Sequence, residues 1–593
     1  MNILGVSCYF HDAAAALLQD GLLVAASEEE RFTRVKHDPR FPDLAIDFCL
    51  RRGGIRAEDL DYVVFFEKPF LKFDRLLTSA LQTFPRSREV FTEAMLTWLG
   101  DKLWVKDLLR KKLRIAPEKI LFSEHHLSHA ASSFFCSPFD TAAILTVDGV
   151  GEWATATVGR GEGTNIEILE EIRYPHSLGL LYSAFTAFLG FEVNDGEYKV
   201  MGMAPFGQPR YVDDVRKVVR VSPDGGFELD LDYFSFHYST TRTYNAKFAA
   251  LFGEARDPAL PFFTRTSGFP SYFGERPADY ERLAIRNEHY ADIAASVQVV
   301  TEEILLSMAR HARELTGLDR LCLAGGVALN SAANGRIIRE GPFREIFIQP
   351  AAGDAGGALG AALYAYHSAL GNPRRFVMEH AYWGDDQSES STADFLRGSA
   401  IPHRQESDDA RLRELVVERL TQGKVVGWVQ DRFEWGPRAL GNRSILADPR
   451  RAEMKDIVNT KIKFREPFRP FAPSVRRDRA AEYFDMAHAA IDFPSRFMMC
   501  VTPVLRDRCN DVAAVTHVDG TARVQIVTPS SNPRYHALID AFGEATGVPV
   551  LLNTSFNLRG EPIVNTAAEA FNTFSKSGMD TLILGNFVID KTT

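Results

Sequence analysis

The sequence predicts an α/β protein, because short apolar runs alternate with segments of helical periodicity along most of the chain. The alternation is clearest in LDRLCLAGGVALNSAANGRII, REIFIQP and AAGDAGGALGAALYAYHSAL, which predict two strands that each lead into a helix. A long helix precedes them, since apolar residues recur at spacings of three and four from Ile293 to Leu315, and Gly317 is placed to end it. With 593 residues, the chain is long enough for at least two domains.

The first half of the chain contains further strands and helices. NILGVSC, LDYVVFF and KILF predict buried strands, and the turn signal Gln19-Asp20-Gly21 between two apolar runs predicts a β-hairpin. Residues 70–118 have a mostly helical pattern, and the stretch from TAAILTV to ILEEI predicts a three-stranded meander. Residues 208–290 are aromatic and weakly periodic, so we expect an irregular insertion that shapes a substrate pocket.

A domain boundary is predicted near Gly371-Asn372-Pro373, which divides the chain into residues 1–372 and 373–593. In the second part, GKVVGWVQDRFEWGPRALGNRSILADPR predicts a strand, a polar loop and the start of a helix. GVPVLLNTSF and DTLILGNFVI predict buried strands. The stretch EEERFTRVKHDPRFP near the N-terminus is rich in both acidic and basic residues, which favours a solvated loop.

Two histidines and two aspartates form a candidate metal site. His125 and His129 are four residues apart, so they share one face if SEHHLSHAASSFF is a helix, which Ser123 is placed to cap. Spacing alone leaves this pair more typical of a core or surface pair than of a metal site. Asp148 and Asp354 each follow an apolar run and adjoin a glycine, at positions where α/β sheets bind ligands. Two imidazoles and two carboxylates suit Fe, Mn or Zn, with positions left open for catalysis.

Other polar residues have two interpretations each. The turns LAGGVALN and GDAGGALGAA let backbone N–H groups approach phosphates, although helix packing explains such glycines about as often. His11, beside Asp12, is either a satisfied loop histidine or a general base. Guanidinium and ammonium groups in the C-terminal part match phosphate or carbamate oxygens, against the alternative of surface ion pairs. These groups are Arg438, Arg443, Lys463, Arg465, Arg469 and Arg523.

The bulk composition excludes several classes. A formal net charge of −10 argues against a nucleic-acid-binding surface, so we expect no nucleic-acid partner. The six cysteines include no CxxC pair and are few for this length, so we expect a protein of the reducing cytoplasm rather than one held by disulfides. The start MNILGVSCYFHDAAAALL lacks a basic region and is not expected to be a signal peptide, and no apolar run is long enough to predict a transmembrane helix.

In ten motifs the chain resembles the NodU/CmcH family of O-carbamoyltransferases. They are HDAAAALL, EEERFTRVKHD, SEHHLSHAAS, TVDGVGE, GEYKVMGMAPFG, AGGVALN, AAGDAGGALGAA, EWGPRALGNRSIL, KFREPFRPFAPSV and LNTSFNLRGEPIV. The resemblance covers nearly the whole chain. It implies an actin-like N-terminal domain with a duplicated ribonuclease-H-like core, similar to the tRNA threonylcarbamoyladenosine transferases. It also implies a YrdC-like C-terminal domain.

The resemblance implies two reactions. The C-terminal domain would make carbamoyl adenylate from carbamoyl phosphate and ATP with Mg²⁺, and the N-terminal domain would transfer the carbamoyl group to a hydroxyl of a small-molecule natural product, as in antibiotic biosynthesis. It implies that a divalent metal ion is bound by His125, His129, Asp148 and Asp354. Fe²⁺ is the expected ion, with Mn²⁺ and Zn²⁺ as alternatives. It implies catalytic roles for His11 as general base, Asp12 and Lys36.

The remaining implied positions bind nucleotides and anions. Carbamoyl adenylate would contact Glu67, Gly149, Gly179, Gly325, Gly326 and Asn330. Carbamoyl phosphate and ATP would contact Arg438, Arg443, Lys463, Arg469, Arg523 and Asn553. A tRNA-modifying enzyme and an actin-like ATPase or sugar kinase stay open as alternatives, as do the acceptor's identity and a homodimer.

Overall fold

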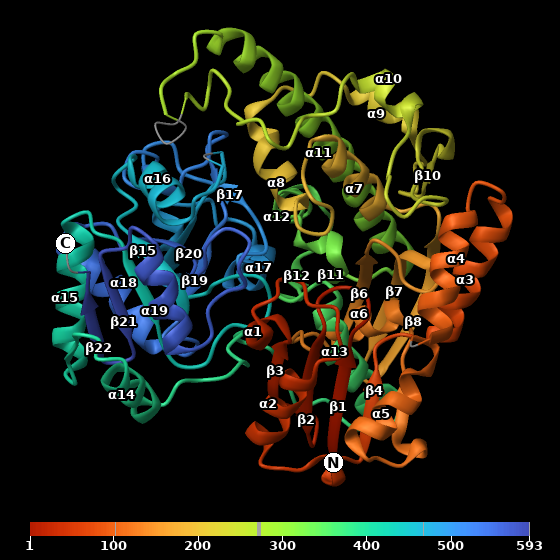
Figure 1. Cartoon of the computed structure of the whole chain (residues 1–593), viewed down its shortest axis with the longest axis horizontal. Coiled ribbons are helices and arrows are strands. Elements are labelled where there is room, and N and C mark those ends of the chain that lie inside the picture. The colour runs from red at the N-terminus through yellow and green to blue at the C-terminus, as the bar shows by residue number, and fades with distance from the viewer. Residues whose placement is uncertain (101, 270–273, 467, 592–593) are drawn as a thin grey trace. The chain divides into compact units, whose positions relative to one another are not determined.

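The computed structural model describes residues 1–593 except 101, 270–273, 467 and 592–593 (Figure 1). The chain divides into two compact units. The first unit comprises Met1–Glu29, Pro39–Thr266 and Pro277–Met378, and the second comprises Glu30–Asp38, Ser267–Arg276 and Glu379–Thr593. The division therefore lies a few residues beyond the predicted 372/373 boundary, and the second unit also includes two segments from the N-terminal side of it.

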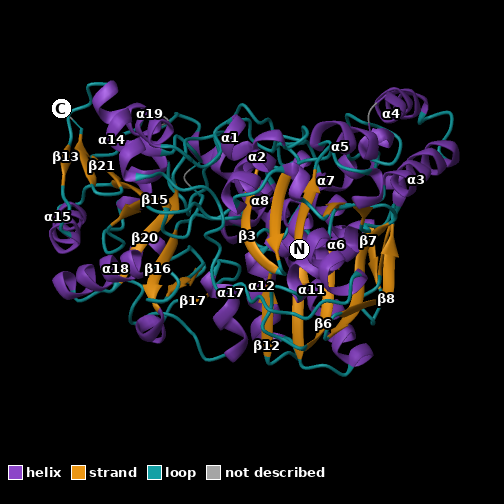
Figure 2. Cartoon of the chain, turned by 90° about the horizontal axis from the view of Figure 1, so that it is seen from below, coloured by secondary structure: helices purple, strands orange, loops and turns teal. Residues whose placement is uncertain are grey.

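The first unit contains two five-stranded sheets with the same topology. One has the order β3-β2-β1-β4-β5 and the other β8-β7-β6-β11-β12. In each, the first three strands in sequence form an antiparallel meander, and the next two add in parallel beside the first. Figure 2 shows the second meander as the neighbouring orange strands β6, β7 and β8. This repetition is the duplicated ribonuclease-H-like core of an actin-like domain, so the predicted fold class, hairpin and meander are confirmed.

The strands of the first sheet are β1 (Asn2–Ser7), β2 (Ala14–Gln19), β3 (Leu22–Glu28), β4 (Tyr62–Phe65) and β5 (Ile120–Phe122). Those of the second are β6 (Thr141–Val147), β7 (Ala154–Glu162), β8 (Asn165–Arg173), β11 (Arg320–Ala324) and β12 (Glu345–Ile348).

Two helices lie between these sheets and carry the candidate metal ligands. Helix α13 (Asp354–Tyr364) packs on β1 and β2, α6 (His125–Phe134) packs on β6 and β11, and the two helices pack on each other. The approach is close: a Cβ atom on Gly360 would lie 1.8 Å from the carbonyl oxygen of Ser128, and one on Gly5 would lie 1.8 Å from that of Ala358. Glycine is required at both positions because a larger residue would separate the layers.

The remaining helices of the first unit confirm part of the predicted pattern. Residues 70–118 are largely helical, as expected. Helix α11 begins at Tyr280, so the end of the segment predicted to be irregular is instead helical. The helices are α2 (Asp43–Gly53), α3 (Pro69–Gln82), α4 (Arg88–Gly100), α5 (Val105–Leu113), α7 (Leu178–Phe188), α8 (Glu197–Met203), α9 (Val212–Val218), α10 (Ala246–Phe252), α11 (Tyr280–Thr316) and α12 (Ser331–Glu340); β9 (Val219–Val221) pairs with β10 (Phe227–Leu229).

The second unit is built on an eight-stranded sheet with the order β13-β22-β21-β14-β15-β20-β16-β19. These strands are β13 (Arg404–Gln405), β14 (Val426–Val429), β15 (Arg443–Ala447), β16 (Ala472–Arg476), β19 (Gln525–Val527), β20 (Val550–Ser555), β21 (Thr581–Leu584) and β22 (Phe587–Asp590). The short pair β17 (Thr502–Pro503) and β18 (Thr521–Ala522) stands apart. The prediction of a helix at RSILADPR is wrong, because Arg443–Ala447 is a central strand. The second α/β unit is confirmed as such, and its YrdC-like character stays a prediction.

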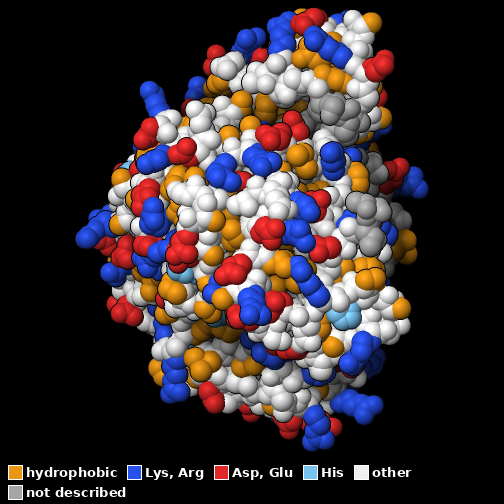
Figure 3. Space-filling model, turned by 90° about the vertical axis from the view of Figure 1, so that its left-hand side faces the viewer, with side chains coloured by type: hydrophobic (Ala, Val, Ile, Leu, Met, Phe, Trp, Pro, Cys, Tyr) orange, Lys and Arg blue, Asp and Glu red, His pale blue; other side chains and the backbone are white. Residues whose placement is uncertain are grey.

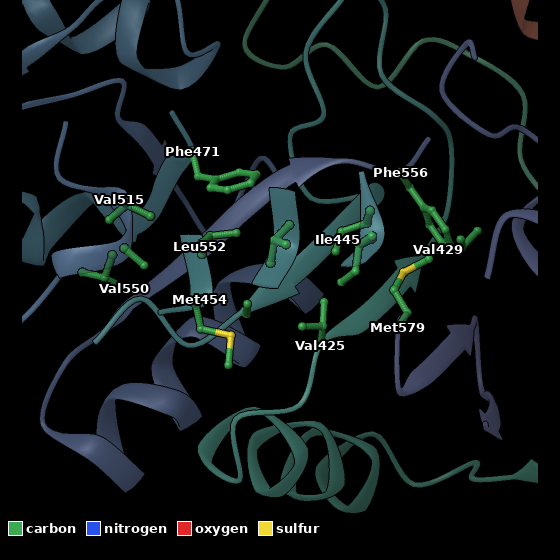
Figure 4. Packing of buried hydrophobic residues seen from close by; sticks show 14 of the residues in the cluster. Val425, Val429, Ile445, Met454, Phe471, Val515, Val550, Leu552, Phe556 and Met579 are labelled. Atoms are coloured by element: carbon green, nitrogen blue, oxygen red, sulfur yellow. The ribbon is translucent and has the colours of Figure 1, made fainter. Parts of the chain in front are cut away.

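Both faces of this sheet are buried under apolar side chains. Leu552 and Ile445 contribute to a cluster on one face (Figure 4), whereas their sequence neighbours Leu551 and Leu446 contribute to a second cluster. This period-2 alternation explains why the strands are apolar throughout. The covering helices are α14 (Glu389–Gly398), α15 (Asp409–Thr421), α16 (Met454–Ile457), α17 (Asp492–Arg496), α18 (Pro533–Thr546) and α19 (Ala567–Lys576).

The charged segment Glu30–Asp38 is part of the second unit. Helix α1 (Glu30–Thr33) holds Arg31, which is 1% exposed and donates from Nη2 to the carbonyl oxygen of Gly436 at 2.7 Å. Arg34 donates to the carbonyl oxygens of Pro562 and Ile563 at 2.8 and 2.7 Å. The prediction of a solvated loop is therefore wrong, because backbone carbonyls distant in sequence satisfy these guanidinium groups.

The surface and the helices agree with the bulk composition. On the face shown in Figure 3, acidic and basic side chains are interspersed. Within the described part of the chain, no helix combines the length and the apolar character that crossing a membrane would require.

Replacing Gly360 tests the importance of the close contact between α13 and α6. Gly360→Ala should lower the free energy of unfolding by about 1–3 kcal/mol, because the new methyl group overlaps the Ser128 carbonyl. Gly100→Ala is the matched control, since no atom lies within 4 Å of a Cβ there. Thermal unfolding of both variants measures the difference, and equal stability would contradict the importance of this contact.

Candidate active site and metal centre

Helix α6 presents its two histidines from a buried position. Its N-cap residue is Glu124, and the predicted cap by Ser123 is wrong, since the Ser123 hydroxyl bonds the Glu124 carbonyl instead. The carboxylate of Glu152 accepts the His125 backbone N–H at 3.0 and 3.1 Å. A negative charge at this end of a helix is favourable, and here it also fixes the start of the ligand-bearing turn.

The four predicted metal ligands converge. Each offers one nitrogen or oxygen atom within 4.8 Å of the others, and all four residues are buried. The Nε2 atoms of His125 and His129 are 3.1 Å apart, and Asp148 Oδ2 lies 3.1 Å from His125 Nε2. Asp354 Oδ1 lies 3.6 and 3.7 Å from the same two nitrogens. The structure thus brings together residues from α6, the end of β6 and the start of α13.

The two aspartates differ in their partners. Asp148 Oδ1 accepts the backbone N–H of Gly326 at 2.7 Å, which leaves Oδ2 toward the histidines. Asp354 is 1% exposed, and neither of its carboxylate oxygens accepts a hydrogen bond from any described residue. The imidazoles of His125 and His129, 3.6 and 3.7 Å away, are its partners, so a cation between the carboxylate and the two rings fits this position.

The histidines lie in a strongly negative environment. Burial lowers the pKa of His125, but Asp354, Asp148 and Glu67 outweigh burial and raise that pKa to about 10. The carboxylates that favour a proton on His125 also favour a divalent cation, which would bind the neutral imidazole once the proton has left. Two nitrogen and two oxygen donors fit Fe²⁺, Mn²⁺ or Zn²⁺.

A buried ion pair stands behind His125. Glu67 Oε2 lies 3.7 Å from His125 Nδ1 and 2.6 Å from the Lys72 ammonium nitrogen. Burial raises the pKa of Glu67, but Lys72 and His125 outweigh burial and lower that pKa to about 2. The ionised carboxylate therefore lies behind the His125 ring at 3.7 Å, beyond hydrogen-bond distance, and adds negative charge next to this histidine.

His126, between the two ligands in sequence, has a structural role. Its ring nitrogens contact the Thr146 hydroxyl at 2.6 Å and the Ala154 carbonyl at 2.9 Å. Burial, followed by His125 and His129, lowers its pKa to about 3, so it stays neutral.

His11 and Asp12 lie near this centre in the same unit. Asp12 Oδ2 is 3.0 Å from His11 Nδ1, which leaves Nε2 as the other basic atom of the ring. Burial lowers the pKa of His11, but Asp12, Asp354 and Asp148 together raise it to about 9. The structure thus brings His11 into the electrostatic field of the two metal-site carboxylates.

The predicted nucleotide-contact residues surround Asp148. A Cβ atom on Gly325, whose φ is +93°, would lie 2.2 Å from the Val147 carbonyl oxygen, and one on Gly179 would lie 2.8 Å from that of Asp148. Asn330 caps α12 by accepting the Ala333 N–H at 3.1 Å. Gly149, in contrast, has open space at its Cβ position. Packing therefore accounts for Gly179 and Gly325, and nucleotide contact stays a prediction for all of these positions.

The second unit holds a cluster of positive charges. Arg523 makes no hydrogen bond or ion pair with any residue that the structure describes, and its Nε atom is fully buried. Burial lowers its pKa well below the usual value, and Arg438, Arg465 and Arg469 lower it further. Arg523 is half-buried, and the three arginines around it make this position favourable for an anion.

Lys463 and Lys36 belong to the same unit. The Lys463 ammonium donates to the side-chain oxygens of Ser555 and Asn557 at 3.1 and 2.6 Å. Burial lowers its pKa well below the usual value, and Arg465, Arg469 and Lys36 add to that effect. Lys36 therefore lies with the basic cluster in the second unit, whereas His11 and Asp12 lie in the first.

Two predicted C-terminal contact residues are engaged within the sheet. Arg443 is fully buried and donates to the carbonyl oxygens of Gln430, Asp431, Asn442 and Asn565 at 2.5, 3.1, 2.9 and 3.2 Å. Asn553 donates to Ser474 Oγ and Gln525 Oε1 at 3.1 and 3.0 Å. The predicted contact of Arg443 with an anion does not fit this geometry, because carbonyl groups already surround its guanidinium.

Sequence reasoning missed two residues that organise the centre. Glu152 caps α6, and Lys72 holds Glu67. Glu152 follows Asp148 in the motif TVDGVGE, which was the available signal, whereas Lys72 has no sequence signature.

The fold and the site define an α/β protein with an actin-like unit, a buried centre suited to a divalent cation, and a second unit with an anion-attracting arginine cluster. The family model described as "Carbamoyltransferase N-terminus" matches residues 2–363, and that described as "Carbamoyltransferase C-terminus" matches residues 417–591. The chain belongs to the carbamoyltransferase family and is an enzyme, which confirms the predicted resemblance.

Relatives span nearly the full chain. An uncharacterised protein of Synechocystis sp. is 45% identical over 100% of this chain and 97% of its own length. Nodulation protein NolNO of Sinorhizobium fredii is 38% identical over 99% and 80%, and the 3'-hydroxymethylcephem-O-carbamoyltransferase of Amycolatopsis lactamdurans is 35% identical over 97% and 97%. Among solved structures, HypF of T. kodakarensis aligns with a TM-score of 0.31 and 17% identity over 63% of this chain and 48% of that one.

Replacing one ligand tests the metal centre. Asp354→Asn should lower the bound metal at least ~10-fold, because even outer-sphere partners of a metal contribute roughly 10–100-fold in affinity. The metal-free variant should be as stable as wild type or more so, since it no longer buries the charge of Asp354. Elemental analysis and thermal unfolding measure both effects.

Asp140→Asn, an exposed aspartate of the same unit, is the control and should retain its metal. Unchanged metal content in both Asp354→Asn and the double variant His125→Ala/His129→Ala would refute the site.

Proposed function

We propose that the protein is an ATP-dependent O-carbamoyltransferase that acts on a hydroxyl group of a small molecule. The supporting observation is that one chain of this family combines two groups in separate units: a buried carboxylate, Asp354, that converges with two histidines, and a guanidinium, Arg523, that makes no hydrogen bond with the described residues. One relative is named for carbamoyl transfer to the hydroxyl oxygen of a hydroxymethylcephem, which supports a hydroxylated acceptor.

The second unit is proposed to form carbamoyl adenylate in two steps with Mg²⁺. Water cleaves carbamoyl phosphate to carbamate and inorganic phosphate, and the carbamate then attacks the α-phosphorus of ATP and releases pyrophosphate. Both substrates are polyanions, and guanidinium groups match their phosphate oxygens. Arg523 is the residue best suited to contact them, since its charge is uncompensated within the protein. Lys36 contributes to the same positive potential.

The first unit is proposed to transfer the carbamoyl group. Asp12 holds the His11 ring through Nδ1, so Nε2 of the neutral ring would accept the proton of the acceptor hydroxyl while the acceptor oxygen bonds to the carbamoyl carbon and AMP leaves. Asp354 and Asp148 help to raise the pKa of His11, and a divalent ion bound by these carboxylates would offset that effect and favour the neutral ring. A divalent ion bound by His125, His129, Asp148 and Asp354, Fe²⁺ before Mn²⁺ or Zn²⁺, would stabilise negative charge on the phosphate and carbonyl oxygens. A cytoplasmic location, a homodimer and the absence of nucleic-acid and membrane partners stay predictions.

Replacing His11 separates the two half-reactions. His11→Asn should release pyrophosphate from ATP in the presence of carbamoyl phosphate at the wild-type rate, yet lower carbamoyl transfer by roughly 10²–10⁴-fold, the usual contribution of a general base. The measurements are pyrophosphate release and mass spectrometry of a panel of hydroxylated metabolites for a carbamoyl mass gain.

His311→Asn, a half-buried histidine paired with Glu170 in the same unit, should behave like wild type. Loss of both half-reactions in His11→Asn would refute the division of labour. ADP as the nucleotide product would favour a kinase or ATPase, and carbamoyl-dependent modification of tRNA would favour the tRNA-modifying alternative.

Replacing Arg523 tests the anion site. Arg523→Met should reduce pyrophosphate release roughly 10- to 100-fold, because a hydrogen bond to a charged group contributes ~1.5–3 kcal/mol. The same variant should be at least as stable as wild type, since it removes a charge from among like charges.

Arg506→Met, an exposed arginine of the same unit, is the control. Wild-type pyrophosphate release from Arg523→Met would remove Arg523 from the site. A fall in both release and stability would indicate a structural role.

A further inference from the structure

A cavity of about 160 Å³ lies in the first unit, beside the metal centre. Its lining includes Tyr9, Phe10, Glu67, Lys72, Arg75 and Lys102. These residues come from the loop after β1, the end of β4, α3 and the segment after α4. No role follows for this cavity from the metal-site geometry itself.

Arg75 in the wall of this cavity lacks a polar partner. Its side chain is 5% exposed, its Nε and Nη1 atoms are buried without hydrogen bonds, and it forms no ion pair with the described residues. One face of the guanidinium lies over the Tyr174 ring, 4.9 Å from its centroid. Stacking covers one face of the guanidinium, and Nη2 is the nitrogen that is not fully buried, so it is the donor available to a ligand.

The charges around Arg75 favour an anion. Glu67 and Glu152 partly offset the charge of Arg75, but Glu67 is paired with Lys72 at 2.6 Å and Glu152 accepts backbone N–H groups of Lys68 and His125. Lys102 donates to the Tyr9 carbonyl oxygen at 2.8 Å and forms no ion pair with the described residues. The lining therefore holds three cationic groups and one carboxylate, an excess of positive charge that favours an anion.

The cavity adjoins the groups proposed for carbamoyl transfer. Phe10 and His11 are consecutive, with ring centroids 4.8 Å apart. On the other side, Glu67 lies 3.7 Å from His125 Nδ1. A molecule anchored in the cavity thus lies next to both the proposed base and a proposed metal ligand.

We infer that this cavity binds a carboxylate or other oxyanion of the acceptor, with Arg75 as its main donor, so that the acceptor class is an acidic hydroxylated molecule. The statement that the bound anion is the carbamoyl acceptor rests on the proposed function. Anion binding by the cavity does not depend on it. A hydrogen bond from a guanidinium N–H to a carboxylate is charge-assisted, and Arg75 Nη2 is the nitrogen placed to donate it. The aromatic rings of Phe10 and Trp98 in the lining suit the apolar part of such a molecule.

The test uses trifluoroacetate as a carboxylate probe and trifluoroethanol as its neutral counterpart, with ¹⁹F NMR line widths measured on the full chain. Wild type should bind trifluoroacetate, inorganic sulfate should displace it, and trifluoroethanol should not bind. Arg75→Gln should weaken trifluoroacetate binding by roughly tenfold or more, the loss expected for a charged hydrogen-bond donor. Arg75→Lys, which keeps the charge but not the guanidinium, should bind with intermediate affinity.

Arg88→Gln, an exposed arginine on the neighbouring helix α4, is the control and should bind like wild type. Equal binding by Arg75→Gln and wild type, or no binding by wild type, would overturn the inference. These binding measurements do not require carbamoyl transfer. A negative result would therefore overturn the anion site without refuting the proposed function, and the reverse also holds.

The link to the acceptor is tested separately by comparing hydroxy acids with their amides as substrates. Wild type should prefer the acids in kcat/KM, and Arg75→Gln should lose that preference while releasing pyrophosphate normally. An unchanged preference in Arg75→Gln would place the acceptor elsewhere.

Discussion

The chemistry of the first unit depends on how closely α13 approaches α6 and β1. Gly360 and Gly5 allow backbone contacts that a single methyl group on either would prevent. Since Asp354 is the first residue of α13 and both histidines lie in the first half of α6, the packing of these two helices also sets the separation of the metal ligands. The two sheets on either side make that separation rigid, because each helix packs against a different sheet.

The two units contain electrostatic defects of opposite sign. Asp354 is a buried carboxylate without a hydrogen bond from the described residues, and Arg523 is a guanidinium whose nearest charges are other arginines. Each lowers the stability of the folded chain, as charges that lose contact with water do. Each also determines the charge of the ligand that binds best there. A cation neutralises Asp354, and an anion neutralises Arg523. A protein that uses polyanionic substrates together with a metal ion would need both.

The sequence predicted the elements where local rules apply, and it named four residues whose side chains converge in the structure. The hairpin, the meander and the positions of Asp148 and Asp354 follow from turns and from strand or helix ends, whose geometry depends on neighbours in sequence. The errors concern long-range partners. Ser123 had the right residue type for a cap, yet α6 is capped by the carboxylate of Glu152, which lies 27 residues after His125 in the chain. Arg31 and Arg443 carried charges typical of solvent or ligand contact, yet distant carbonyl groups bind them.

Glu67 connects the metal centre to the Arg75 cavity, because its carboxylate contacts His125 on one side and Lys72 on the other. Its negative charge favours a cation at the metal centre, while Lys72 prevents that charge from repelling an anion in the cavity. An anion near Arg75 and a cation near His125 also attract each other through the protein interior, where the effective dielectric constant is lower than in water. Occupation of either site should therefore favour occupation of the other, so that the acceptor and the metal ion are assembled together around one buried carboxylate.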